Sequence, residues 1–479
     1  VTVNGTVYVS DITLSRSAIT LYKGNTYDLN AEVCPSNANN RTVRWYSYNS
    51  SIASINTYSG LVTAKSAGVT TVYAIAQDGS GVQDCCTVTV KQIPTCPEED
   101  TGTTNVPEKT FQDPVDVYTG AHLIKNSIMT LFGGQALKLT AQYDSTKLLS
   151  GVLGKGWYHN YEKHLEIVDC EAHVYTGPSS YSRYSSNDDC TVYTCTAPNK
   201  NGYVLTVDCS AQYPYIINCN NQSTEYYNTD GYLAKIVDHQ GFATEITYTA
   251  SLITITDMVS GKKMYLEKDS SGKVVRVYDD ANRQVTFTYT DGLITTICDM
   301  NGNNLHFSYN EDGQVLTGTD SKGTCYFTNT YDDCGRVATQ KDAIAGSVTS
   351  TFTYNDDGTR ITTDRNGNTS TRKFDSNGLL LSHTDENGNT KTYTYDGHYN
   401  ILKETDANGK SIVKEYNSFN KPISITDRNG NKTTISYDTN GNIVKISHPN
   451  INGVIPEETF VYNSRNQLLH HTDLRGTVT

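Results

Sequence analysis

The sequence lacks any run of 18 consecutive apolar residues, so we expect no transmembrane segment in this chain. It also lacks an excess of positive charge: 38 Lys and Arg stand against 51 Asp and Glu, which gives a net charge of −13. Nucleic-acid binding needs a basic surface that replaces the counterions of the phosphate backbone. No such stripe occurs, and nucleic acid is therefore excluded as an expected partner.

The motifs of common enzymes are missing as well. There is no Cys-x-x-Cys pair, no Gly-x-Ser-x-Gly elbow and no glycine-rich phosphate loop ahead of a helix. A glycosidase needs two converging carboxylates, and no pair stands out among acidic residues that lie mostly in turns. We therefore expect a non-enzymatic protein without a cofactor, and we keep a secreted carbohydrate-active enzyme as a remote alternative.

Two patterns were weighed as metal sites. His159 and His164 flank Glu162, but the segment has the pattern of a strand and does not spell His-Glu-x-x-His. A structural role beside Trp157 explains them better. The Asp-x-Asn-Gly-Asn loops are rich in oxygen, yet each offers only one or two carboxylates for calcium. Turn formation explains the same residues, so no metal site is predicted.

What the sequence has in abundance is tyrosine, with 35 Tyr against 10 Phe and 2 Trp. Tyrosine suits a sheet that packs on one side while the hydroxyl group stays near water. Charged residues make up only 19% of the chain, and no pattern favours helices. A chain of 479 residues is also too long for one small core. The sequence predicts an all-β protein of several domains.

Cysteine usage points to an oxidising compartment. The 12 cysteines form an even set without metal-binding spacing, which is typical of disulfides in a secreted protein. Scattered free thiols in a cytosolic or anaerobic setting remain the alternative. The cysteines are Cys34, Cys85, Cys86, Cys96, Cys170, Cys190, Cys195, Cys209, Cys219, Cys298, Cys325 and Cys334.

The first domain is predicted over residues 1–91. Seven or eight short alternating runs between residues 10 and 91 indicate a β-sandwich, with Trp45 as a core anchor. The motifs resemble the bacterial Ig-like group 2 domain, a surface spacer or adhesive module without chemistry. They lie at 19–24, 43–45, 51–53, 59–64 and 67–72.

Within this Ig-like resemblance, one disulfide is proposed. Cys34 ends one expected strand, while Cys85 and Cys86 begin another. Because such strand ends meet in an Ig-like sandwich, we expect Cys34 to pair with Cys85 or Cys86.

A linker is predicted at 92–110, where three prolines and acidic residues occur without periodicity. The next domain is predicted at 111–224. Its motifs at 113–120, 137–145 and 153–160 resemble the domain that opens the repeat shell of bacterial Rhs-type proteins. The cysteine-rich stretch from Cys170 to Cys219 is interpreted as a local elaboration.

Residues 225–479 are predicted to be an array of about ten β-hairpin repeats. Asp-x-Asn-Gly segments recur every 21 residues, and an aromatic residue recurs at intervals of 20 or 21. Asn-Gly between alternating strands is a strong hairpin signal, because both residues tolerate a positive φ. The repeat residues are Tyr354, Phe374, Tyr395, Tyr416 and Tyr437, with the turn glycines Gly367, Gly388, Gly409 and Gly430.

The array resembles the YD repeat, in which a Tyr-Asp pair closes a strand, as at Tyr331-Asp332, Tyr395-Asp396 and Tyr437-Asp438. YD repeats form the Rhs shells of bacterial toxins and the barrel of teneurins. No self-cleaving C-terminal core motif is recognisable here. The resemblance therefore implies either a YD-repeat shell or an open, curved, solenoid-like array.

The tyrosine rows have two interpretations. Tyr393, Tyr395, Tyr416 and Tyr437 form either the packing ladder of the stacked hairpins or a face that stacks on sugars or protein. Periodicity favours the ladder.

The expected function is that of a non-enzymatic, secreted, cell-surface structural protein. It would be the N-terminal part of a shell that carries or encloses a C-terminal cargo or toxin in the same polypeptide. The alternative is an extracellular adhesin that binds cell wall, glycans or host protein. The chain opens with Val1-Thr2-Val3 in the manner of a strand, and at Thr479 it stops where another repeat would begin. We therefore interpret it as a piece of a longer product.

Overall fold

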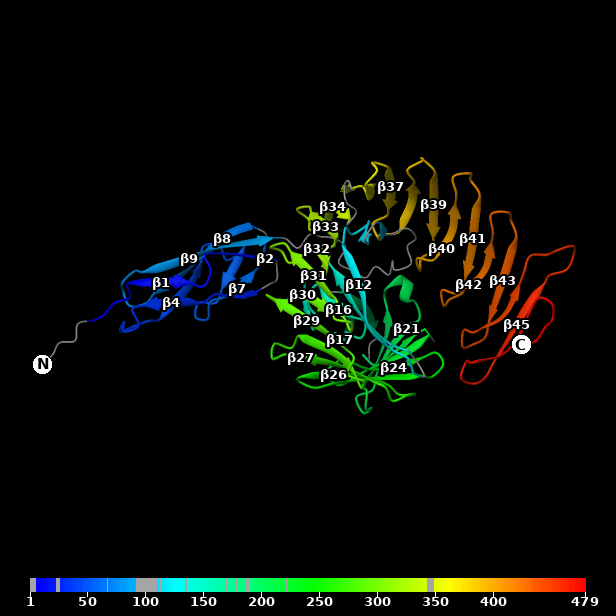
Figure 1. Ribbon diagram of the computed structural model, residues 1–479, viewed down its shortest axis with the longest axis horizontal. Coiled ribbons are helices and arrows are strands. Elements are labelled where there is room, and N and C mark those ends of the chain that lie inside the picture. The colour runs from blue at the N-terminus through cyan, green and yellow to red at the C-terminus, as the bar shows by residue number, and fades with distance from the viewer. Residues whose placement is uncertain are drawn as a thin grey trace. The chain divides into compact units, whose positions relative to one another are not determined.

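The computed structural model describes residues 6–22, 26–66, 68–91, 110–111, 114–133, 136–168, 170–177, 180–186, 190–220, 222–342 and 349–479. The chain forms two compact units, Val1–Cys96 and Pro97–Thr479 (Figure 1). Among the described residues, the regular structure consists of β-strands and one short 3-10 helix, η1 (Pro198–Lys200). The predicted all-β class is confirmed.

The first unit is the expected sandwich. Its sheets have the strand orders β2-β9-β8-β5, β3-β7-β6 and β1-β4. Trp45 lies in the core, only 5% exposed. Gly60 has a φ of +79°, and an added Cβ would overlap the Leu29 carbonyl and the Trp45 ring, so only glycine fits there. The strands are β1 (Asp11–Leu14), β2 (Ala18–Tyr22), β3 (Thr26–Asp28), β4 (Ala31–Cys34), β5 (Val43–Ser47), β6 (Ala53–Ile55), β7 (Leu61–Ala64), β8 (Gly68–Ala76) and β9 (Gln83–Lys91).

The Cys34 bridge expected in this unit is not formed in the structure. Cys34 pairs with Asp11 at the start of β1, whereas Asp84, next to Cys85, accepts a hydrogen bond from the Leu14 amide at the end of β1. The two strand ends therefore lie at opposite ends of β1. All three thiols are free: Cys34 and Cys85 are exposed, and Cys86 is buried.

The second unit begins with small antiparallel sheets, one of which has the strand order β12-β13-β16. This three-stranded sheet is called the small sheet below. The pair β10-β11 precedes it along the chain, and the pair β14-β15 lies between β13 and β16. The strands are β10 (Thr110–Phe111), β11 (Val115–Asp116), β12 (Leu123–Leu131), β13 (Leu137–Asp144), β14 (Ser150–Gly151), β15 (Gly154–Lys155) and β16 (Trp157–His159).

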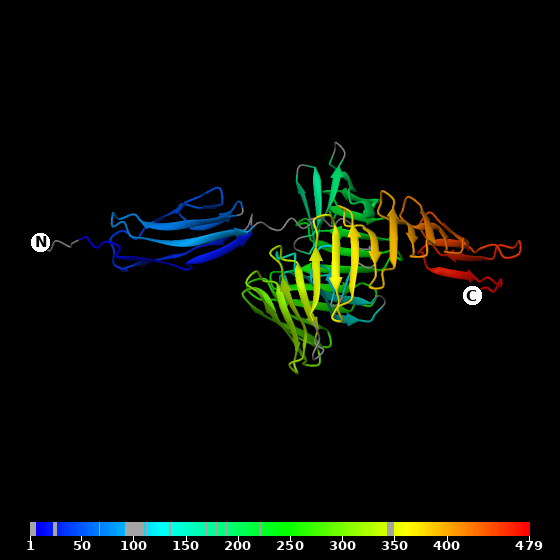
Figure 2. The ribbon, with the colours of Figure 1, turned by 90° about the horizontal axis from the view of Figure 1, so that it is seen from above.

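A single antiparallel sheet of 30 strands, β17 to β46, contains the rest of the unit, each strand pairing with the next along the chain (Figures 1 and 2). We call it the repeat sheet. It shows no break at the predicted boundary between residues 224 and 225, because both lie inside β23.

The strands of the repeat sheet before the regular 21-residue repeats are β17 (Lys163–Val168), β18 (Glu171–Thr176), β19 (Tyr181–Ser186), β20 (Val192–Cys195), β21 (Tyr203–Val207), β22 (Tyr215–Cys219), β23 (Ser223–Tyr227), β24 (Leu233–Asp238), β25 (Ala243–Tyr248), β26 (Leu252–Asp257), β27 (Lys263–Lys268), β28 (Val274–Asp279), β29 (Gln284–Thr290) and β30 (Leu293–Cys298). Those that follow are β31 (Asn304–Tyr309), β32 (Val315–Asp320), β33 (Cys325–Tyr331), β34 (Val337–Asp342), β35 (Ser350–Tyr354), β36 (Thr359–Thr363), β37 (Thr369–Phe374) and β38 (Leu380–Thr384). The last are β39 (Thr390–Tyr395), β40 (Ile401–Thr405), β41 (Ser411–Tyr416), β42 (Pro422–Thr426), β43 (Lys432–Tyr437), β44 (Ile443–Ser447), β45 (Glu457–Tyr462) and β46 (Leu468–Thr472).

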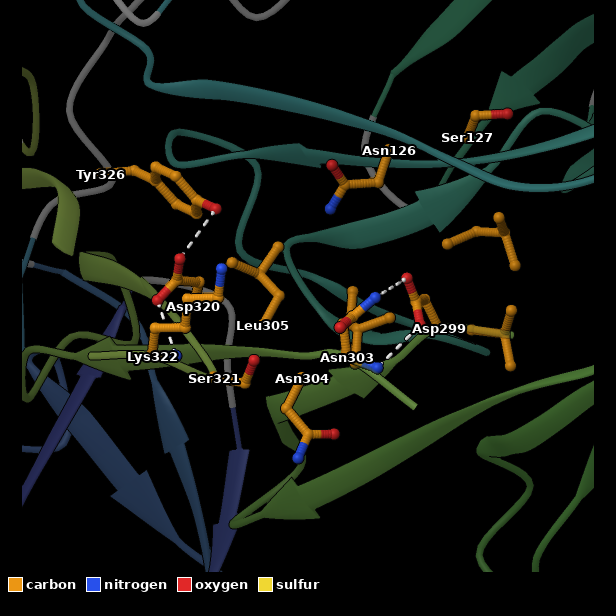
Figure 3. Close-up of a pocket in the computed structure, with 13 residues that line it drawn as sticks. Asn126, Ser127, Asp299, Asn303, Asn304, Leu305, Asp320, Ser321, Lys322 and Tyr326 are labelled. Atoms are coloured by element: carbon orange, nitrogen blue, oxygen red, sulfur yellow. Dashed lines mark hydrogen bonds between the residues drawn. The ribbon is translucent and has the colours of Figure 1, made fainter. Parts of the chain in front are cut away.

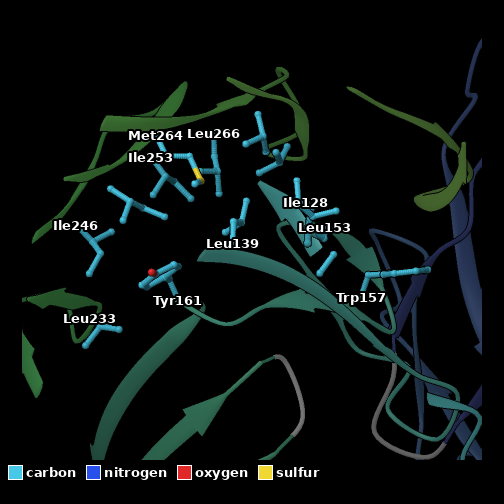
Figure 4. Packing of buried hydrophobic residues seen from close by; sticks show 14 of the residues in the cluster. Ile128, Leu139, Leu153, Trp157, Tyr161, Leu233, Ile246, Ile253, Met264 and Leu266 are labelled. Atoms are coloured by element: carbon cyan, nitrogen blue, oxygen red, sulfur yellow. The ribbon is translucent and has the colours of Figure 1, made fainter. Parts of the chain in front are cut away.

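The small sheet packs on one face of the repeat sheet, which we call the inner face. Leu139 and Ile128 of the small sheet belong to one buried cluster with Ile253 and Leu266 of the repeat sheet (Figure 4). A hydrogen bond also joins the two sheets: Trp157 Nε1 donates to the hydroxyl of Tyr309 at 3.1 Å. The main core of this unit therefore lies between the two sheets.

The repeat sheet curls, and parts of it distant in sequence meet. The amide of Leu165 in β17 donates to the carbonyl of Gly231, just before β24, at 2.7 Å. Further along, Asn220 Nδ2 donates to the carbonyl of Phe419 at 3.2 Å. Asn201 Nδ2 likewise donates to the carbonyl of Ser418 at 3.0 Å. Turns of the early strands thus touch turns of the late repeats.

Candidate functional site

The hairpin turns are built by one repeated hydrogen-bond pattern. In the turn that begins at Asp364, the carboxylate Oδ1 accepts the amides of Asn366 and Asn368, each at 2.8 Å. The amide of Gly367 donates to the Asp364 carbonyl, and the glycine has a φ of +84°. These features are those of a three-residue hairpin loop with a glycine bulge. The equivalent glycines Gly388, Gly409 and Gly430 have φ angles of 82°, 77° and 86°.

The repeat tyrosines link each hairpin to the one before it. Tyr395 donates its hydroxyl to the carbonyl of Leu380 at 2.9 Å, and Tyr416 donates to Ile401 at 3.1 Å. Tyr437 donates to Pro422 at 2.8 Å in the same way. In all but one case the acceptor is the residue paired with the aromatic residue of the previous repeat; Val274, the acceptor of Tyr289, pairs with Lys268 instead. The further pairs are Tyr248 with Leu233, Tyr289 with Val274, Tyr309 with Ile294, Tyr331 with Val315 and Tyr354 with Val337.

A recurrent irregularity in strand pairing explains why these carbonyls are available. The register shifts between Thr394 and Tyr395, so that Tyr395 pairs with Ile401. The same shift occurs at Tyr416 and at Tyr437. A bulge of this kind takes backbone groups out of the regular ladder, and the tyrosine hydroxyl of the next repeat binds the carbonyl at that point.

Phe374 and Tyr393 occupy the inner face. Phe374 takes the repeat position without a hydroxyl group; it is 2% exposed, and its ring centroid lies 5.2 Å from that of Tyr118. Tyr393 is 4% exposed in the same cluster. The structure thus places the repeat aromatic residues against the chain itself.

After Tyr393, the small sheet and the segment around Val115 and Tyr118 no longer cover the inner face. In earlier repeats, the residue two places before the repeat aromatic residue is buried. Such residues include Phe287, Phe307, Phe352 and Tyr393. The small sheet and the segment around Val115 and Tyr118 cover these positions. Among the described residues, no apolar side chain after Tyr393 is fully buried. The equivalent residues Lys414, Ile435 and Phe460 are only half-buried.

A polar groove opens between β12 and two turns of the repeat sheet, and Figure 3 shows its lining. Its volume is about 470 Å³. Asn126 comes from β12, Asp299 from the β30–β31 turn and Asn304 from the start of β31. Asp320 is the last residue of β32, and Tyr326 lies in β33. The sequence gives no signal that β12 lies across these two hairpins.

The histidines and carboxylate weighed as a metal site have structural roles. The Nδ1 of His159 accepts the Tyr161 amide at 3.2 Å, and burial lowers the His159 pKa to about 3. Burial raises the pKa of Glu162 to about 7, and its Oε1 accepts the Val152 amide at 2.9 Å. His164 instead stacks on Tyr175, with ring centroids 4.3 Å apart.

A partly buried ion pair escaped the sequence analysis. The Nζ of Lys163 lies 2.6 Å from the Glu225 carboxylate, which also accepts the hydroxyl of Tyr227 at 2.7 Å. Lys163 opens the repeat sheet, and Glu225 lies six strands later in it. Nothing in the local pattern around either residue shows that they meet.

Within the described ranges, no group of three or more His, Cys, Asp or Glu side chains is placed to hold a metal ion. No described helix is long and apolar enough to cross a bilayer.

Four family models match the chain in succession. Residues 8–87 match the Bacterial Ig-like domain (group 2), and residues 112–182 match the Domain of unknown function (DUF6531). Residues 192–329 match the Teneurin YD-shell, and residues 374–411 and 416–450 match the RHS Repeat. The resemblances inferred from the motifs are thereby confirmed. The last two families are structural repeat families, and both match residues of the repeat sheet.

Individual relatives match only in part. An uncharacterized protein of Clostridium acetobutylicum is 36% identical over 90 residues, which are 19% of this chain and 9% of that protein. An Ig-like virion protein of Serratia phage KSP90 is 36% identical over 84 residues, which are 18% of this chain and 32% of that protein. This chain therefore spans a third or less of the curated relatives it matches.

Two of the solved structures that align with this chain are toxin complexes. The crystal structure of TcdB2-TccC3-Cdc42 aligns at 12% identity with a TM-score of 0.30, over 73% of this chain and 24% of that chain. The Photorhabdus luminescens Tc holotoxin pore aligns at 12% identity with a TM-score of 0.26, over the same shares. Values this low do not establish a common function.

Proposed function

We propose that this chain, a bacterial Ig-like domain followed by YD-shell and RHS repeats, is a secreted or cell-surface protein whose repeat sheet is the N-terminal part of a shell for a C-terminal cargo. The cargo, which includes the toxin alternative, would belong to the same polypeptide. The Ig-like unit would serve as a spacer that holds the shell away from the cell.

The observation that carries this proposal is the uneven covering of the inner face. From β17 to β40, the chain's own residues 114–161 supply the packing partners. From β41 onward, Ile435 and Phe460 remain half-buried at positions that are filled in earlier repeats. Apolar surface at such positions is stabilised when another segment packs on it. A further part of the polypeptide would supply that packing.

The absence of recognisable chemistry supports a structural role. The buried titratable groups His159, Glu162, Lys163 and Glu225 have partners within the fold. Burial accounts for the lowered pKa of His159 and the raised pKa of Glu162. None of the four groups lines the groove.

The proposal can be tested by cysteine accessibility in two forms of the protein. Phe460→Cys is made in residues 1–479 and in the full natural polypeptide, and maleimide labelling at residue 460 is followed by peptide mass. We expect labelling in the short form and protection in the full polypeptide. Val461→Cys is the matched control, because Val461 is 51% exposed on the opposite face and should be labelled in both.

Equal labelling of residue 460 in both forms would show that nothing covers the inner face. The shell proposal would then fail, and an open binding module on the cell surface would replace it.

A further inference from the structure

The groove of Figure 3 is a concave site bordered by elements far apart in sequence. Asn126 and Ser127 of β12 form one wall, and the turns at Asp299 and Asp320 form the other. Ile297 and Leu305 contribute apolar surface to its lining. Its volume of about 470 Å³ falls within the range usual for small-molecule sites.

The carboxylates of this wall are held in fixed positions. Asp299 Oδ1 accepts the amides of Asn301 and Asn303, both at 2.8 Å. Asp320 Oδ1 accepts the amides of Lys322 and Thr324, at 2.9 and 2.8 Å. The hydrogen bond from the Asn303 side chain lowers the Asp299 pKa, and the Thr324 amide does the same for Asp320. Both side chains are therefore ionised acceptors at neutral pH.

The amides in the groove have unused hydrogen-bonding capacity. The side chains of Asn126 and Asn304 are half-buried, and neither has a hydrogen-bond partner among the residues that the structure describes. An amide offers two donors and an acceptor. Figure 3 shows the two amides on opposite sides of Leu305. Each amide can therefore donate to, or accept from, a ligand that reaches its own end of the groove.

The form of β12 favours recognition by side chains over the addition of a peptide strand. Among the described strands β12 pairs with β13 alone, and its residues Asn126, Ser127 and Ile128 line the groove. The register of that pairing shifts between Ser127 and Met129, at the groove itself. Bulges interrupt a strand edge and hinder further strand pairing. An extended peptide could therefore not form a continuous set of backbone hydrogen bonds with β12.

We propose that this groove binds a neutral saccharide of one or two pyranose rings. Sugar hydroxyls donate to the Asp299 and Asp320 carboxylates and accept from the amides of Asn126 and Asn304. The apolar Leu305 and the ring of Tyr326, which is 45% exposed, suit the C–H faces of a pyranose. Two carboxylates against the single Lys322 disfavour an anionic ligand. The proposal holds whether or not the repeat sheet encloses a cargo.

The test uses residues 1–479 and the probes cellobiose, maltose and N,N′-diacetylchitobiose, each titrated at millimolar concentrations by NMR. We expect at least one of these disaccharides to bind. Asn304→Ala and Asn126→Ala should each weaken its binding about threefold to tenfold, the effect of one lost hydrogen bond. Tyr326→Ala should also weaken it. Tyr232→Ala is the control, because Tyr232 is 49% exposed and lies outside the groove.

Three results would overturn the proposal. The first is no binding of any of the disaccharides to protein whose melting curve shows a folded chain. The second is binding that Asn304→Ala and Asn126→Ala leave unchanged, which would place the ligand elsewhere. The third is binding of spermidine alone, which would identify the groove as a site for cations held by Asp299 and Asp320.

Discussion

His239 and Asn442 are 203 residues apart in the chain, yet the Nε2 of His239 lies 2.7 Å from the side-chain oxygen of Asn442. Asn466 extends the contact: its Nδ2 donates to the His239 carbonyl at 3.0 Å, and its Oδ1 accepts from Asn442 Nδ2 at 2.9 Å. Together with the bonds from Asn201 and Asn220 to the late turns, these contacts join early and late parts of the curled repeat sheet. We call this line of contacts the seam.

Asn442→Ala should loosen the last repeats without unfolding the rest. The substitution removes side-chain bonds to His239, Asn466 and Asp438, and we expect β43 to β46 to open locally with a loss of about 1–3 kcal/mol. Hydrogen exchange measured segment by segment gives this value. Asn431→Ala is the matched control, because Asn431 makes the same turn bond to Asp427 but contacts no described residue across the seam. Equal effects of the two variants would contradict the role of the seam.

Tyr416→Phe should destabilise the array by about 1 kcal/mol, because it removes the hydrogen bond to the Ile401 carbonyl and leaves the ring in place. Tyr462 is the matched control: it holds the equivalent position, but its hydroxyl binds no described residue. Tyr462→Phe should therefore leave the free energy of unfolding unchanged within a few tenths of a kcal/mol. Chemical denaturation of both variants distinguishes the two cases. If Tyr416→Phe left the free energy of unfolding unchanged, ring packing alone would account for the contribution of the repeat tyrosines to stability.

The sequence predicted the repeat more fully than the site. A 21-residue period with Asp-x-Asn-Gly turns determines hairpins locally, and each of the turns that begin at Asp364, Asp385, Asp406 and Asp427 joins two neighbouring strands of the repeat sheet. Both Asn and Gly tolerate a positive φ, and the structure shows that in the turn at Asp406 Gly409 adopts it and Asn408 does not. The hydrogen bonds within such a loop explain why: the asparagine amide points to the Asp406 carboxylate.

What the sequence could not show depends on long-range contacts. Asn126 and Asn304 line one groove only because β12 crosses two turns of a sheet that begins later in the chain. Lys163 meets Glu225, and His239 meets Asn442, through the curl of the repeat sheet. The 21-residue period of the sequence does not specify how tightly the repeat sheet curls. Turn chemistry is local, whereas the meeting of distant turns is set by the accumulated twist of many strands.

Gly409→Ala should destabilise its hairpin by about 1–2 kcal/mol, because alanine resists the φ of +77° that this position adopts. No atom lies within 4 Å of the added methyl group, so backbone strain alone would be measured. Gly397→Ala is the control, since Gly397 has equally open surroundings and no positive φ. Asn408→Ala should have little effect. Thermal melting of the three variants tests this prediction. An unchanged melting temperature for Gly409→Ala would contradict the turn geometry.

Thiol labelling should separate the cysteines by burial. In native protein, iodoacetamide should modify the exposed Cys34, Cys85 and Cys334, while Cys86 and Cys219 stay protected. Burial raises the pKa of the Cys86 thiol to about 11 and that of Cys219 to about 12, which further lowers their reactivity. Peptide mapping without reductant should recover the Cys170–Cys190 pair, whose Cα atoms are 5.2 Å apart. A recovered peptide joining Cys34 to Cys85 or Cys86 would restore the bridge inferred from the sequence.

Stability should fall as the pH is lowered from about 6.5. Burial lowers the pKa of both His122 and His159 from 6.5 to about 3, so the unfolded chain takes up protons that the folded chain does not. The stability present above pH 6.5 is lost through this window by roughly 1.4 kcal/mol per pH unit for each histidine. Glu162 acts in the opposite sense: burial raises its pKa from 4.5 to about 7, so between these values the folded state binds the extra proton. The net slope between pH 6.5 and 5 is therefore about that of one histidine.

Two substitutions should change this slope in opposite directions. His159→Gln removes one of the two histidines and should make the melting temperature nearly constant between pH 6.5 and 5. Glu162→Gln removes the compensating carboxyl and should make the decline about twice as steep. Comparing each variant with itself across pH separates these slopes from any loss of stability that the substitution causes at all pH values. If both variants kept the parent slope, the buried positions of His159 and Glu162 would not govern the acid response, and the exposed carboxylates would have to account for it.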